Sequence, residues 1–153
     1  MYYEKLAKEL PKDAVEESDG KVTGKGYDTK GYKYQYIVNR LNEVVGFNWS
    51  TKQEVKLINT KKAQSGREMY EYIAKVSIVI TTPATGATAG LETVRTCYGG
   101  HTSNNHGDAA KGAFTNAFKK TAALFGVGKQ AYEGTIPDDD NQPPETKPYK
   151  SWG

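Results

Sequence analysis

Lysine side chains gather in one predicted helix of this chain. From His106 to Gly126 the sequence reads HGDAAKGAFTNAFKKTAALFG, which contains Lys111, Lys119 and Lys120 and no acid after Asp108. Lysine contacts phosphate groups as a flexible point charge and does not select a base sequence. The pattern therefore indicates either a surface that binds a polyanion or an ordinary solvated helix face.

The spacing of the apolar residues in this segment predicts an amphipathic helix. Asn105 is expected to cap its start, with Asp108 three residues later in the manner of a capping box, and Gly126 is expected to end it. The residues expected on the buried side are Ala110, Phe114, Ala117, Phe118, Thr121 and Phe125, and those expected on the exposed side are Lys111, Thr115, Lys119 and Lys120.

A second main helix is predicted from Tyr34 to Val45. Its apolar residues recur with helical period, and Gly46 follows as a stop signal. We expect Lys33, Tyr36 and Arg40 on its other side. The ring of Tyr36 is a candidate for stacking on an unpaired base.

Three strand-like segments lie between the two main helices, and a short helix within Tyr2–Leu10 precedes them, ended by Pro11. Short loops favour an antiparallel meander, which leaves one face of the sheet for helices. The fold class is therefore predicted as α+β, with a three-stranded antiparallel β-meander packed against two main helices. The predicted strands are Phe47–Leu57, Tyr70–Ile80 and Leu91–Tyr98, and the predicted loops are Asn59–Gly66 and Pro83–Gly90.

The composition is that of one folded domain with an acidic end. We assign residues 1–134 to a single domain and residues 135–153 to a disordered tail, which either keeps the protein soluble or occupies a basic groove. The net charge of +3 rises to +5 without the segment from Gly134, because that segment has four acids and two lysines. A modestly basic body is compatible with nucleic acid.

The sequence also bears on the compartment. The single cysteine, Cys97, excludes an intramolecular disulfide and suits a reducing environment. The N-terminus does not resemble a signal peptide, and no apolar run reaches membrane-spanning length. We therefore expect a cytoplasmic protein without a membrane partner.

Two stretches of the chain carry a resemblance to a known family. Residues Tyr36 to Ser50 read YIVNRLNEVVGFNWS, and residues Gly107 to Gly126 combine an alanine-rich start, paired lysines and a phenylalanine-glycine end. With the strands between them, over Tyr27 to Tyr132, they resemble the Rad-fifty-two family of single-strand annealing proteins, in a short form like those of phages. The host compartment would be a bacterial or phage-infected cell.

The resemblance implies a function in homologous recombination and repair. A protein of this kind forms a homo-oligomer, as a ring or a helical filament, and holds single-stranded DNA in a positively charged groove. It pairs complementary strands without ATP or another cofactor, and it is not an enzyme. A single-strand-binding protein or a host recombination factor is the further partner that we consider.

The resemblance also implies which side chains contact DNA. Lys119 and Lys120 match the paired basic residues that hold the DNA backbone, and Lys111 matches a basic position near the helix start. Ala123 and Tyr36 depart from the family, because each stands where a basic residue is often found.

Three further cations are candidate DNA contacts. Arg40 and Lys33 flank the position of Tyr36 and could replace the missing charge. Lys129 follows the predicted helix at His106–Gly126, in the run Gly-Val-Gly-Lys. This run lacks the other residues of a phosphate-binding loop, and we retain Lys129 as a groove cation.

Two other functions remain open at this point. A double-stranded RNA-binding module has the same order of helix, three strands and helix, although its lysines stand at the start of the second helix. A metal-dependent nuclease would use an acid and a lysine on one strand face, as Glu54 and Lys56 are spaced, but it also needs a second acid that the sequence does not mark.

A zinc site is the remaining alternative, and its residue types are suitable but their spacing is not. We therefore expect loop histidines near the groove and no bound metal. The residues concerned are Cys97, His101, His106 and Asp108.

Overall fold

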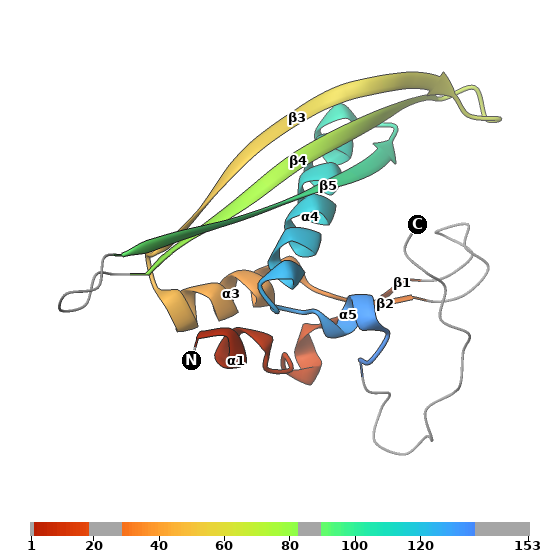
Figure 1. The fold of residues 1–153 in the computed structure, drawn as a ribbon. Coiled ribbons are helices and arrows are strands. Elements are labelled where there is room, and N and C mark those ends of the chain that lie inside the picture. The colour runs from red at the N-terminus through yellow and green to blue at the C-terminus, as the bar shows by residue number, and fades with distance from the viewer. Residues whose placement is uncertain (1, 19–28, 83–89, 137–153) are drawn as a thin grey trace, which may run out of the picture.

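The computed structural model of the chain describes residues 2–18, 29–82 and 90–136. Its elements follow the predicted order of helix, three strands and helix, with short elements added at both ends (Figure 1). In chain order they are α1 (Tyr2–Ala7), the 3₁₀ helix η1 (Lys12–Ala14), β1 (Val15–Ser18), β2 (Thr29–Tyr32), α3 (Tyr34–Val45), β3 (Trp49–Lys62), β4 (Glu68–Thr82), β5 (Leu91–Ser103), α4 (His106–Leu124) and α5 (Gln130–Glu133).

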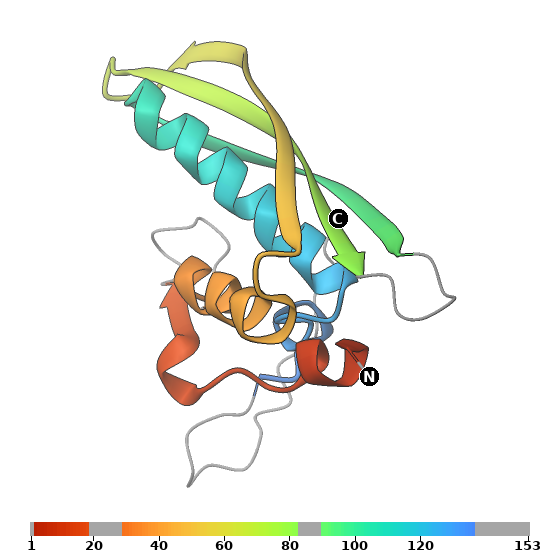
Figure 2. The same ribbon diagram turned by 90° about the vertical axis from the view of Figure 1, so that its left-hand side faces the viewer.

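The three long strands form one antiparallel sheet in the order β3-β4-β5. Trp49 pairs with Ile80, and Ile80 pairs with Thr93 on the other side of β4. Figure 2 shows α4 lying lengthwise along one face of this sheet, with α3 and α1 beyond its C-terminal end. The predicted α+β class, with an antiparallel meander packed against two main helices, is confirmed.

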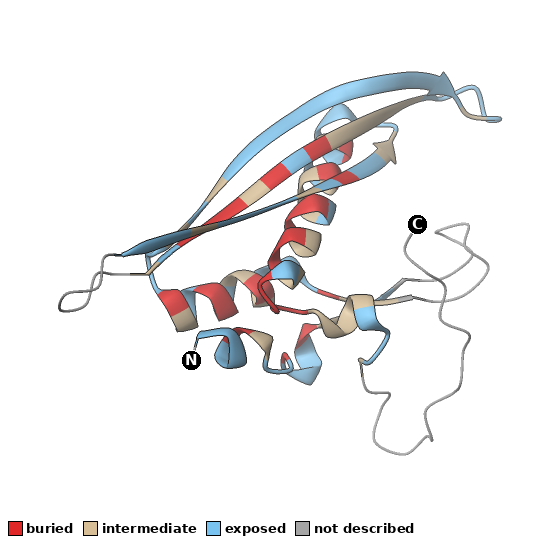
Figure 3. Ribbon diagram, viewed as in Figure 1, coloured by how far each residue is buried: buried red, intermediate tan, exposed pale blue. Residues whose placement is uncertain are grey.

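The alternation of β4 explains how the sheet and α4 share a core. Ala74, Val76, Ile78 and Ile80 all point to one face and are buried there. The buried side of α4 faces them, and the matching red bands on β4 and α4 are visible in Figure 3. Ile37 and Leu41 of α3 are also buried, and they belong to the same core.

Several predicted boundaries were wrong. Strand β3 continues to Lys62 through a register irregularity between Leu57 and Asn59, so that the turn is shorter than predicted. Strand β5 extends past Tyr98 to Ser103, and α1 ends at Ala7 rather than near Leu10. Backbone pairing with β4 extends both strands beyond the point where their apolar alternation fades, in β3 by resuming after the irregularity.

The sequence did not indicate β1, β2 and α5, which lie around α3 and the end of α4 (Figure 1). Strands β1 and β2 pair with each other as an antiparallel ribbon. The predicted loop at Pro83–Gly90 falls almost wholly outside the described residues, and so does most of the predicted tail. Within the described parts of the chain, no helix is long and apolar enough to cross a membrane.

Candidate nucleic-acid interface

Helix α4 begins and ends where its sequence predicted. The side chain of Asn105 accepts a hydrogen bond from the backbone N–H of Asp108 at 3.0 Å, which satisfies one of the free amides at the helix start. At the other end, Gly126 has a φ of +95°, a left-handed conformation that favours glycine. Both predicted ends of this helix are confirmed.

The lysines of α4 do not share one face. Lys111, Thr115 and Lys119 follow one another at four-residue intervals, so the stripe that they form winds by about 80° around the helix axis. Lys120 lies about 100° further around the axis. It shares its side of the helix with Asn116, whose amide donates to the carbonyl of Gly100 in β5 at 2.9 Å. Lys120 is therefore beside β5, whereas the stripe faces away from that strand.

Exposure differs among these lysines. Lys111 is exposed, as predicted, whereas Lys120 and Lys119 are half-buried. The side chain of Lys119 is only 17% exposed, so the expectation of a solvated position was wrong for it. Among the residues that the structure describes, no acidic group forms an ion pair with Lys111 or with Lys120.

Lys119 is held by an acid from a distant part of the chain. Its Nζ donates to Oε1 of Glu16 in β1 at 2.8 Å, and the Glu16 side chain is 46% exposed. Thus the strongest sequence candidate for a phosphate contact already has an anion beside it. Sequence reasoning missed this pair because β1 had no clear strand signal.

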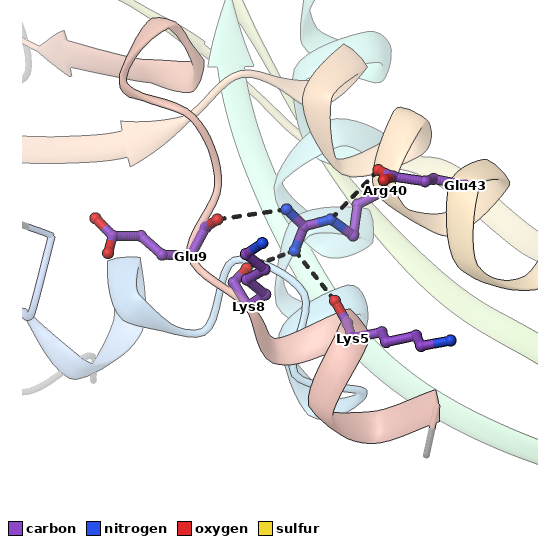
Figure 4. Close-up of polar contacts among 5 residues, drawn as sticks. All are labelled: Lys5, Lys8, Glu9, Arg40 and Glu43. Atoms are coloured by element: carbon purple, nitrogen blue, oxygen red, sulfur yellow. Dashed lines mark hydrogen bonds and ion pairs between the residues drawn. The ribbon is translucent and has the colours of Figure 1, made fainter.

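Arg40 is buried, so its expected place on the free side of the second helix was wrong. Its Nη1 donates to the carbonyls of Lys5 and Lys8, and its Nη2 donates to that of Glu9 at 3.3 Å (Figure 4). Its Nε lies 3.8 Å from Oε2 of Glu43. Carbonyls at the end of a helix need donors from elsewhere, and the guanidinium fork supplies them to α1 and the following turn. This placement favours a structural role.

Lys33 and Tyr36 lie at the start of α3. Lys33 is exposed at the N-cap position, and its Nζ is 6.0 Å from the centroid of the Tyr36 ring. Tyr36 is half-buried, so only part of its ring is free to stack on a base. The neighbouring Tyr34 packs its ring on Phe118 of α4, with centroids 5.0 Å apart, which joins the start of α3 to the lysine-bearing helix.

Comparison with known proteins identifies the family. The profile of the Rad52/22 family double-strand break repair protein matches residues 2–146. The chain belongs to the Rad52/22 family. The match confirms the resemblance and extends it beyond Tyr27–Tyr132, to α1 and β1 on one side and to residue 146 on the other. No curated protein is detectably similar to the chain.

In this Rad52/22 family protein Lys129 stands just beyond α4, at the N-cap position of α5. Its Nζ is 3.3 Å from Oε1 of Glu133, one helical turn later. Because the side chain of Lys129 is half-buried and has this carboxylate nearby, its positive charge is partly neutralised.

The histidines considered as zinc ligands have other partners. His106 is the first residue of α4, where its ring stacks on Tyr70 with centroids 3.7 Å apart and its Nδ1 is hydrogen-bonded to the Tyr72 hydroxyl at 2.8 Å. His101 lies in β5 against Gly112. The expectation of loop histidines was therefore wrong. Over residues 2–18, 29–82 and 90–136, no group of three His, Cys, Asp or Glu residues is placed to hold a metal ion.

The pair considered for a nuclease lies on the outer face of the sheet. Glu54 stands directly opposite Lys75 of β4, and both side chains are exposed. Lys56 shares that face two residues along β3, as the spacing predicted. The arrangement is that of an ordinary cross-strand charge pair.

Proposed function

We propose that this Rad52/22 family protein binds single-stranded DNA along α4 and promotes the pairing of complementary strands, as a homo-oligomer and without a nucleotide cofactor. The observation that supports the proposal is that Lys111, Lys119 and Lys120 lie on α4. The ends of this helix are capped, and its side chains are hydrogen-bonded to β5 and β4. These lysines are the leading candidates for the DNA backbone contacts.

The chemistry of annealing supports this choice of residues. Two strands can pair only if their base edges stay free, so the protein must hold them by phosphate and sugar. Lysine ammonium groups meet this need, and each neutralised phosphate releases counterions. Lys33 and the exposed part of Tyr36 are secondary candidates, because Tyr34 joins their segment to α4.

Arg40 is left out of the proposed DNA contacts. Its Nη1 and Nη2 atoms are already directed at the carbonyls of Lys5, Lys8 and Glu9, and the side chain is buried. A phosphate could reach it only if α1 moved away. Its role in our proposal is to hold α1 against α3.

A homo-oligomer would extend a small patch into a longer track for DNA. Strand β3 offers a surface for a second copy of the chain. Val55 and Leu57 pair with Ala74 and Tyr72, so they point to the helix-covered face of the sheet. They are nevertheless 37% and 43% exposed, because α4 packs chiefly on β4 and β5. Apolar side chains on an edge strand are suited to association with another chain.

The test is a comparison of two double variants that remove the same charge. Lys119→Ala with Lys120→Ala alters α4, whereas Lys52→Ala with Lys75→Ala removes two exposed lysines from the outer face of the sheet. Binding of a labelled oligothymidylate is measured by fluorescence anisotropy at several salt concentrations. We expect the α4 variant to bind at least about tenfold more weakly, with a salt slope flatter by about one, and the outer-face variant to bind normally.

Two outcomes would contradict the proposal. Equal affinities of the two double variants would remove α4 as the binding site. Preferential binding of duplex RNA over oligothymidylate by the unaltered protein would favour the double-stranded RNA-binding alternative. Annealing itself is followed by the quenching of complementary labelled oligonucleotides in the absence of ATP.

A further inference from the structure

The ion pair between Glu16 and Lys119 joins two elements that are far apart in the chain. Glu16 lies in β1, Lys119 lies in the third quarter of α4, and 103 residues separate them. The 2.8 Å separation between Nζ and Oε1 makes the contact both an ion pair and a hydrogen bond. A carboxylate oxygen thus stands where a phosphate oxygen would contact this lysine.

The backbone around Glu16 is fixed by hydrogen bonds and strand pairing, which set the direction of its side chain. Ala14 is fully buried, and its carbonyl accepts a hydrogen bond from the N–H of Lys33 at 2.7 Å. On the opposite face of the ribbon, Glu17 is paired in register with Lys30, and their charged groups are 3.7 Å apart. Successive side chains of a strand point to opposite faces. The ribbon therefore directs Glu16 toward α4 and Glu17 away from it.

We infer that Glu16 acts as an internal competitor for phosphate, which neutralises Lys119 in the free protein and must give way or share the ammonium group when DNA binds. The inference rests on the proposed function, and it assigns a regulatory contact to the same site. Glu16 is nearly half exposed, so it can turn into solvent without burying its charge. Lys119 then keeps a partner in both states.

With the carboxylate beside Lys119, the protein should bind DNA more weakly and with a smaller dependence on salt than without it. A phosphate that approaches Lys119 meets a second negative charge within a few ångströms, and the repulsion opposes binding. While the carboxylate stays bound, Lys119 also neutralises less than one phosphate, so fewer counterions are released. Lys120 lies on a different side of α4 and keeps its full charge.

The matched variants are Glu16→Gln and Glu17→Gln. Each removes one negative charge from the same strand, but only the first removes the partner of Lys119. We expect E16Q to bind oligothymidylate about two- to fivefold more tightly than E17Q, because a partly exposed ion pair such as Glu16–Lys119 is worth a factor of that size. The salt slope of E16Q should be steeper by up to about one. Circular dichroism checks that both variants are folded.

Three further variants, Lys119→Ala alone, with E16Q and with E17Q, test whether Glu16 acts through Lys119. In that background E16Q should have no more effect than E17Q. Equal affinities of E16Q and E17Q, or weaker binding by E16Q, would overturn the inference while the proposed function stands, provided that Lys119→Ala weakens binding. Failure of the unaltered protein to bind oligothymidylate would overturn both.

Discussion

The backbone of Ala117 in α4 lies directly against Gly99 in β5. A Cβ atom added to Gly99 would be 2.4 Å from the backbone nitrogen of Ala117, so only glycine allows the helix to approach this closely. Two side chains fix the helix on either side of this contact. Asn116 donates to the Gly100 carbonyl, and the Thr121 hydroxyl is 3.0 Å from the Val76 carbonyl. The position of every lysine on α4 depends on these contacts between the helix and the sheet.

The first prediction concerns that contact. Gly99→Ala should destabilise the protein by about 3 kcal/mol, because the added methyl group meets backbone atoms that cannot rotate away. Gly100→Ala is the matched control, since its added Cβ would meet its nearest atom at an ordinary 3.5 Å. Urea unfolding followed by circular dichroism measures both. Similar stabilities of the two variants would show that α4 is not seated on Gly99.

The second prediction separates structural from DNA-binding roles among the cations of α3 and its N-cap. Arg40→Ala should cost about 3 kcal/mol of unfolding free energy and expose the segment around α1 to proteolysis, because three backbone carbonyls lose a charged donor. Lys33→Ala, at the exposed N-cap position of the same helix, should leave stability unchanged. An Arg40→Ala protein of normal stability that binds DNA poorly would restore Arg40 as a DNA contact.

The features that could be predicted from the sequence are local, whereas those that could not depend on residues far apart in the chain. The cap at Asn105, the end at Gly126 and the alternation of Ala74 to Ile80 are local patterns, so they were predictable. The burial of Arg40 was not, because the carbonyls that it contacts lie 31 to 35 residues away in the sequence. The Glu16 contact was equally hidden, since a four-residue strand has little periodicity to detect.

The third prediction tests the proposed surface for assembly. Leu57→Glu should reduce the size of the oligomer, because it places a charge on the partly open face of β3. Val94→Glu is the control. Its residue pairs with Val79, is 44% exposed and lies on the opposite face of the sheet. Light scattering after size-exclusion chromatography measures the mass. Oligomers of unchanged size in Leu57→Glu would place the interface elsewhere.

The fourth prediction tests whether DNA follows the stripe of α4 that Lys111 begins. Lys111→Ala should weaken oligothymidylate binding about two- to fivefold and flatten the salt slope by roughly 0.7, because one phosphate contact is lost. Lys75→Ala removes a similarly exposed lysine from the outer face of the sheet and should change neither quantity. If Lys75→Ala is as damaging as Lys111→Ala, binding responds to net charge rather than to the position of the lysine. If neither has an effect while the Lys119 and Lys120 variant does, the DNA leaves α4 before it reaches Lys111.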